Sequence, residues 1–171
     1  MVYPIVKLGD PVLEREAETV TEFGTPELEK FLADMFESMY AAKGVGLAAP
    51  QIGFGRKIAV IDVSNNERPE DKIVIINPKI LKVEGRQEGE EGCLSIPGFR
   101  EQVRRGKRVT IRAQDAKGEW FEKTGEDLLA RAFLHETDHL YGKLYFTHIS
   151  ALKRDLMKRK IKKLQRAGDW K

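Results

Sequence analysis

The pentapeptide His135-Glu136-Thr137-Asp138-His139 constrains this chain more than any other segment. On a helix, positions i and i+4 lie about 40° apart around the surface, one turn above one another. Two imidazoles placed in this way can bind one divalent metal ion, and Glu136 can reach a water molecule at that ion. The pattern indicates metal-assisted hydrolysis of a carbonyl compound. The alternative is a solvent-exposed helix that carries the pattern by chance.

The flanking residues favour a buried helix over an exposed one. Thr124 is expected to be the N-cap, with Glu126 and Asp127 in the first turn, and Gly142 is expected to end the helix. The body between them is mostly apolar: Leu128, Leu129, Ala132, Phe133 and Leu134. A largely apolar helix is buried, and buried histidines beside acids need a partner such as a metal ion.

Cys93 is the best candidate for a third metal ligand. No glutamate follows Glu136, position 145 is Tyr145, and His148 is the only remaining histidine, so the downstream segment offers poor options. Cys93 is the only cysteine, which excludes an internal disulfide and agrees with a reducing compartment. It could instead be a small buried apolar residue. One cysteine and two histidines would leave a tetrahedral position free for water, as a catalytic site needs.

The glycine-rich segment 44–53 is the third segment of interest. Its Gln51 carries an amide that could donate a hydrogen bond to a developing oxyanion. Taken alone, however, the segment reads as a tight turn. It lacks the spacing of a phosphate-binding loop, so nucleotide binding is not expected.

Together these segments resemble the three motifs of the peptide deformylase family, in the same order. The motifs are Gly44-x-Gly46-x-Ala48-Ala49-x-Gln51, Glu91-Gly92-Cys93-Leu94-Ser95 and His135-Glu136-x-Asp138-His139-Leu140-x-Gly142. The resemblance covers almost the whole chain, and its length and charged last helix are similar to the bacterial type I enzymes.

The resemblance implies a metal-dependent hydrolase. Cys93, His135 and His139 would bind one divalent ion, with Fe²⁺ expected and Ni²⁺, Co²⁺ or Zn²⁺ as possible substitutes. Glu136 would be the general base toward the water and then the general acid toward the leaving amine.

The resemblance also implies residues around that centre. The Gln51 side chain and the Leu94 backbone N–H would hold the oxyanion. Asp138 would pair with Arg104 or Arg105, a choice that the sequence leaves open.

The implied substrate is the N-formyl-methionyl end of a nascent peptide, and the products are formate and a free N-terminus. The methionine pocket would consist of Val45, Leu128 and Ala132, and Arg131 departs from the apolar residue usual near that pocket. Arg100 would contact the substrate backbone, although it could equally be a solvated surface charge. The peptide is expected to pair as an added strand beside Gly44, Val45 and Gly46 and the 97–99 segment.

Length and composition indicate a single domain, residues 1–171. The chain is 41% hydrophobic and 33% charged, it has no apolar run long enough to cross a membrane, and no signal peptide is visible, so a cytoplasmic protein is expected. From Ala151 to Lys171 nine basic residues and two acids give +7, which leaves −4 on the rest of a chain with net charge +3. Residues 149–171 are therefore expected to form a basic helix, which by resemblance would contact the ribosome surface.

The hydrophobic pattern predicts an α+β fold, with antiparallel sheets wrapped around a central metal-binding helix, an N-terminal helix and a C-terminal helix. The first helix should begin at Pro26 with Thr25 as its N-cap and stop at Gly44. Strands are expected over 57–63, 73–76, 80–83 and 108–113, with a hairpin turn at 115–118.

Three other functions compete with deformylation. A metallopeptidase could use the same helix but lacks its downstream ligand. A ribosome- or RNA-binding module without turnover would explain the basic helix but not Gln51, Cys93 and Glu136. A degenerate homologue is disfavoured because all three motifs keep their chemical residues.

Overall fold

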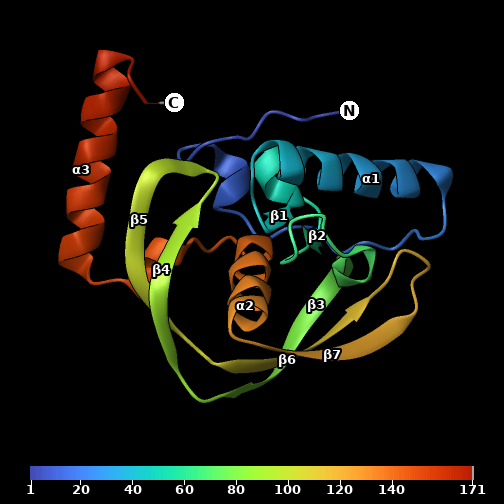
Figure 1. Ribbon diagram of the computed structural model, residues 1–171. Coiled ribbons are helices and arrows are strands. Elements are labelled where there is room, and N and C mark those ends of the chain that lie inside the picture. The colour runs from blue at the N-terminus through green and yellow to red at the C-terminus, as the bar shows by residue number, and fades with distance from the viewer. Residues whose placement is uncertain (171) are drawn as a thin grey trace.

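A central helix organises the molecule in the computed structural model, which describes residues 1–170 (Figure 1). Helix α2 (Leu128–Leu140) stands in the middle, α1 (Pro26–Ala41) lies across one end, and α3 (Ala151–Ala167) stands at one side beside β5. Within the described residues, none of the helices is both long and apolar enough to span a membrane.

Two antiparallel sheets surround α2. The larger has the order β1-β2-β3-β6-β7, with β1 Gly46–Ala48, β2 Ile58–Ile61, β3 Ile73–Glu84, β6 Arg108–Gln114 and β7 Trp120–Glu126. The smaller pairs β4 (Gln87–Cys93) with β5 (Ile96–Arg105), and Figure 1 shows this hairpin arching around the side of α2 that faces α3. The expected α+β fold with a central metal-binding helix is confirmed.

The strand predictions located β2, β3 and β6 of the large sheet, but they missed β1 and both strands of the small sheet. The two runs expected at 73–76 and 80–83 form one strand, β3, with register shifts against β6 near Asn77–Lys79 and Leu81. Strands β4 and β5 were not predicted because Gln87–Cys93 is rich in glutamate and glycine, which have low strand propensity. Cross-strand partners such as Glu88 opposite Arg104 offset that propensity.

The start of α2 differs from the prediction. Strand β7 continues to Glu126 in register with β6, so Thr124 is a strand residue rather than an N-cap. Asp127, with φ of 53°, turns the chain into the helix. A side chain at Gly125 would overlap Leu129 and Phe133, so β7 and α2 pack here at their closest approach. The end is as expected, because Gly142 follows α2 with φ of 76°.

Helix α1 begins as predicted. The Thr25 side chain accepts a hydrogen bond from the Leu28 N–H, and Pro26 occupies the first turn. The helix ends at Ala41, and the left-handed residue after it is Lys43, not the expected Gly44. The turn at 115–118 is confirmed by a hydrogen bond from the Gly118 N–H to the Asp115 carbonyl.

Helix α3 packs on the body of the molecule through few residues. Met157 and Ile161 are buried against a cluster that includes Ile96 and Tyr145, but Leu152 and Leu156 are 69% and 46% exposed. Most of the helix surface, including its lysines, is therefore open to solvent. Lys171, the last residue of the predicted basic segment, lies outside the described residues.

Candidate metal centre

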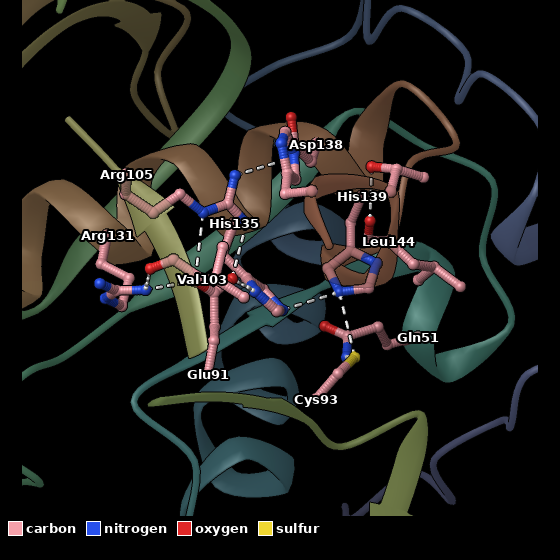
Figure 2. Close-up of polar contacts among 12 residues, drawn as sticks. Gln51, Glu91, Cys93, Val103, Arg105, Arg131, His135, Asp138, His139 and Leu144 are labelled. Atoms are coloured by element: carbon pink, nitrogen blue, oxygen red, sulfur yellow. Dashed lines mark hydrogen bonds and ion pairs between the residues drawn. The ribbon is translucent and has the colours of Figure 1, made fainter. Parts of the chain in front are cut away.

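The fold brings three potential metal ligands together from two elements. Cys93 ends β4, while His135 and His139 lie one turn apart on α2, and their ligand atoms are all within 4.8 Å of one another. The Cys93 Sγ lies 3.4 Å from the His139 Nε2, which is 3.1 Å from the His135 Nε2 (Figure 2). The spacing and chemistry of these donors fit a catalytic centre with three protein ligands.

The two histidines differ in the direction of their pKa shifts and in their hydrogen-bond partners. Burial lowers the pKa of His139 well below its usual value, so its imidazole is neutral, and its Nδ1 has no partner among residues 1–170. The His135 Nδ1 is 2.6 Å from the Glu91 Oε1, which directs its Nε2 toward Cys93 and His139. Burial opposes protonation of His135, but the hydrogen bonds with Cys93 and Glu91 outweigh it and raise the pKa of His135.

Glu91 is the centre of a buried charge cluster. Its carboxylate accepts hydrogen bonds from Arg105 Nε and Nη2 at 3.1 and 2.6 Å, and from Arg131 Nη1 at 2.7 Å. Burial alone would raise the pKa of Glu91, but the hydrogen bonds from His135 and Arg105 hold it far below its usual range. A fixed anion therefore orients His135 from behind, as carboxylates commonly do for metal-binding histidines.

The structure decides which arginine pairs with Asp138. Arg105 Nη1 donates to the Asp138 Oδ2 at 2.8 Å, whereas Arg104 is exposed and pairs with Glu88. His148 also lies 2.8 Å from the Asp138 Oδ2, so it supports the cluster and is not a ligand of the centre. Arg105 thus links Asp138 on α2 to Glu91 on β4.

Glu136 is a buried carboxyl group close to the potential metal ligands. It is only 4% exposed, and its Oε1 has no hydrogen-bond partner in the described part of the chain. Burial raises the pKa of Glu136 to about 7, close to the value that suits a general acid–base group. Its carboxylate lies against the backbone of Gly46, where a Cβ would overlap it.

Gln51 points its amide at the centre. Its Oε1 accepts a hydrogen bond from the Ala48 N–H at 3.0 Å, which leaves the amide N–H₂ facing the Cys93 Sγ at 3.5 Å and the Ser95 Oγ at 3.4 Å. The short helix of residues Ala49–Ile52 buries the side chain to 1% exposure. The glycine-rich segment, which taken alone indicates only a tight turn, therefore supplies an oriented donor through Gln51.

A cavity of about 660 Å³ opens onto these residues. All the predicted substrate-binding residues line it, namely Gly44, Val45, Gly46, Arg100, Leu128 and Ala132, and so do Leu94 and the 97–99 segment. Arg100 is 60% exposed and pairs with Glu90. Arg131, which departs from the apolar residue usual near the pocket, also lines the cavity, but it is buried and held by Glu91 and the Val103 carbonyl.

Two residues beside the centre, Glu91 and Tyr145, are not predicted from the sequence. Glu91 belongs to the second motif, and its position two residues before the candidate ligand Cys93 is the one signal in the sequence for its role. Tyr145 is buried with its ring stacked 6.4 Å from that of His135. Nothing in the local sequence around Tyr145 indicates that contact.

A buried His-Glu-x-x-His helix and a converging cysteine, set in a cavity of an α+β domain, define a metal-dependent hydrolase. Comparison with known proteins narrows this class. The family model of polypeptide deformylase matches residues 2–155. A peptide deformylase of Acidobacterium capsulatum is 61% identical over 170 residues, which cover 99% of each chain.

Solved structures agree with the sequence relatives. The crystal structure of a peptide deformylase from Legionella pneumophila superimposes with a TM-score of 0.90 at 43% identity, covering 100% of this chain and 99% of that one. The structure from Thermotoga maritima gives 0.81 at 41% identity, covering 88% and 99%. The chain belongs to the peptide deformylase family. It is an enzyme that removes the N-formyl group from nascent peptides, and it has the Cys-His-His metal site typical of that family.

Proposed function

We propose that deformylation in this chain depends on Glu136 as the proton-transfer residue beside a metal held by Cys93, His135 and His139. The observation that carries the proposal is the buried Glu136 Oε1, which has no partner in residues 1–170 and belongs to a residue that lines the same cavity as Cys93 and His135. Glu136 takes the proton of the attacking water and returns it to the leaving amine. A carboxyl group with a pKa of about 7 can do both near neutral pH.

The bound metal supplies Lewis-acid polarisation of the formyl carbonyl and a lowered pKa for the attacking water. We propose Fe²⁺ as the resident ion, with Ni²⁺, Co²⁺ or Zn²⁺ as possible substitutes, because thiolate and imidazole ligands accept all four. The Gln51 amide and the Leu94 N–H stabilise the oxyanion. The orientation of Gln51 by the Ala48 N–H supports this role, since preorganised donors need no rearrangement during reaction.

The cavity supports an N-formyl-methionyl substrate. Val45, Leu128 and Ala132 provide apolar surface for the methionine side chain, and Arg100 at the exposed rim is available to the peptide carbonyls. The peptide backbone lies between Gly44–Gly46 and the 97–99 segment, as a strand added to their edges. Arg131 also lines the cavity, but its guanidinium is paired with the buried Glu91, and this neutralisation of its charge supports a preference for the apolar methionine side chain.

We propose that residues 1–171 form one deformylase domain, and that its basic C-terminal segment, 149–171, acts through α3. Eight lysines and arginines lie on α3, and all but Arg154 are exposed. This surface supports docking on the RNA-rich ribosome, where newly made peptides emerge in the cytoplasm.

The test is formate release from N-formyl-Met-Ala-Ser by protein purified without oxygen and loaded with Fe²⁺ or Ni²⁺. The Glu136→Gln variant should lose roughly 100-fold to 10,000-fold in kcat, the usual contribution of a positioned acid–base group. Its metal content, measured by elemental analysis, should stay the same. Glu122→Gln, on the strand surface away from the cavity, is the control and should be unchanged. Full activity in Glu136→Gln would refute the assignment.

A further inference from the structure

The end of the chain reaches back to the substrate cavity. After α3, Gly168 adopts φ of 73°, and the Asp169 N–H donates to the Leu164 carbonyl, so the helix ends in a turn. Figure 1 shows the chain end turning from the tip of α3 toward the body of the molecule. This turn places Trp170 against the bend of the β4–β5 hairpin.

Trp170 contacts this bend directly. Its indole Nε1–H donates a hydrogen bond of 2.8 Å to the Pro97 carbonyl, and the ring packs against the buried cluster that contains Ile96 and Met157. Phe99 packs against the same cluster. Pro97 and Phe99 are also residues that line the cavity. The 97–99 segment therefore lines the substrate cavity and is also bound by Trp170.

A second contact secures Trp170 from the N-terminal segment. Lys7 Nζ donates to the Trp170 carbonyl at 3.0 Å and lies 5.6 Å from the centre of its ring. The next residue, Leu8, donates its N–H to the Ser95 carbonyl at 2.8 Å. Lys7, Leu8 and Trp170 thus meet at the hairpin bend, between the Cys93 ligand and the 97–99 segment.

We infer that Trp170 is a positioning residue for substrate binding: it fixes the 97–99 segment at the place where the peptide backbone docks. This segment needs an external support, because Gly98 is exposed with φ of 84° and the bend interrupts the regular β4–β5 register. The inference rests on the proposed peptide-binding edge. Trp170 touches neither the ligand atoms nor Glu136 in the described contacts, so it acts on binding and not on the chemical step.

The experiment compares Trp170→Ala and Trp170→Phe with the unaltered enzyme on two substrates. N-formyl-Met-Ala-Ser extends along the 97–99 segment, whereas N-formyl-methionine amide ends before it. Trp170→Ala should raise KM for the longer peptide roughly threefold to tenfold, as expected for one hydrogen bond with its packing, and leave kcat within about twofold. KM for the amide should not change. Trp170→Phe, which keeps an aromatic ring but loses the N–H, should fall between.

Trp120→Ala is the matched control, because Trp120 is the other tryptophan of the chain and lies exposed on β7 against Arg112. It should leave both KM values unchanged. Binding of the product peptide Met-Ala-Ser, measured by calorimetry, should weaken in Trp170→Ala by the same factor as KM rises.

Two results would overturn the inference. One is an unchanged KM for the longer peptide in both Trp170 variants. The other is an equal loss on both substrates together with a lower melting temperature, which means that Trp170 only stabilises the fold. If the unaltered enzyme released no formate from either substrate, the proposed function would fail separately, and the calorimetric comparison would still decide the role of Trp170.

Discussion

At the scale of single residues, Glu91 shows how one buried charge can serve both stability and the site. It is 5% exposed and joins Arg105, Arg131 and His135, so no other carboxylate in the described chain accepts hydrogen bonds from as many charged or ionisable partners. Removing one member of such a group leaves the others buried without compensation, which costs more than the group contributes when complete.

Glu91→Gln should therefore lower the free energy of unfolding by roughly 3–5 kcal/mol. It should also weaken metal binding by roughly tenfold to 100-fold, because the His135 ring loses its anionic support. Urea unfolding and metal competition with a chelator measure the two effects. The neighbouring Glu90 is exposed and pairs only with Arg100, so Glu90→Gln is the control and should change neither quantity appreciably. If both variants changed the free energy of unfolding and the metal affinity by the same amount, Glu91 would not be the residue that organises the cluster.

Gly46→Ala tests the contact between β1 and Glu136, the proposed proton-transfer residue. A Cβ at Gly46 would overlap the Glu136 carboxylate, so this carboxylate must move out of place. We expect kcat to fall at least roughly tenfold, since proton transfer needs hydrogen-bond reach. Gly55→Ala is the control, because a Cβ there meets only Val12 at 3.8 Å, and it should retain activity. Steady-state kinetics together with an unchanged circular dichroism spectrum would distinguish displacement of Glu136 from unfolding of the variant.

At the scale of helices and strands, the sequence could predict the features that depend on residues close together in the chain. The start of α1 follows from Thr25 and Pro26, and the end of α2 follows from Gly142, because caps act within one turn. Strands β4 and β5 follow from pairing between residues far apart, such as Gln87 with Arg105, and no local property of these residues indicates it.

The features of the site also divide into those that the sequence motifs predict and those that only the folded structure shows. The motifs were sufficient to predict the ligands and to place Gln51 near them. They could not predict that Arg105 rather than Arg104 contacts Asp138, because neighbouring strand residues point to opposite faces and only the register decides which one is buried. Nor could they predict that Arg131 turns inward to Glu91.

The loop after β2 provides a prediction about pH. Asp62 is fully buried and accepts hydrogen bonds from the Ser64 hydroxyl, the Tyr40 hydroxyl and the Asn66 N–H. Burial acts to raise the pKa of Asp62, but these hydrogen bonds outweigh it and lower the pKa below the ordinary 3.8. The carboxylate therefore stabilises the fold above pH 3.8, and that contribution is lost as the pH falls through the lowered value.

Asp62→Asn should reduce the free energy of unfolding at pH 7 by roughly 1.5–3 kcal/mol, the scale of hydrogen bonds to a charged group. The difference from the unaltered protein should shrink below about pH 4, as the native carboxylate gains its proton. Melting temperatures of the metal-free proteins from pH 7 to pH 3 measure this. Asp155→Asn, at an exposed position of α3, should show no such trend. A difference that stays constant with pH would mean that charge is not what stabilises the loop.

At the scale of the whole molecule, the metal centre joins two parts of the fold that local structure does not hold together. Cys93 belongs to the two-stranded sheet, while His135 and His139 belong to the helix packed inside the five-stranded sheet. A ligand that binds only the folded state stabilises it by mass action, by about 2.7 kcal/mol when free ligand is 100 times its Kd. Metal removal should therefore lower the melting temperature and abolish formate release together.

The Cys93→Ser variant tests whether the metal stabilises the fold by joining Cys93 to the two histidines rather than by binding elsewhere. A serine hydroxyl is a poor replacement for a thiolate ligand, so adding Fe²⁺, Ni²⁺ or Zn²⁺ should raise the melting temperature of the unaltered protein by several degrees more than that of the variant. His148→Gln, which removes a histidine that contacts only Asp138, is the control and should keep the full metal response. If Cys93→Ser gained as much stability from metal as the unaltered chain, the two histidines alone would hold the ion. Within residues 1–170, the β4–β5 hairpin would then be attached to α2 mainly through the Glu91 cluster and the hydrogen bond from Gln87 to the Asp127 carbonyl.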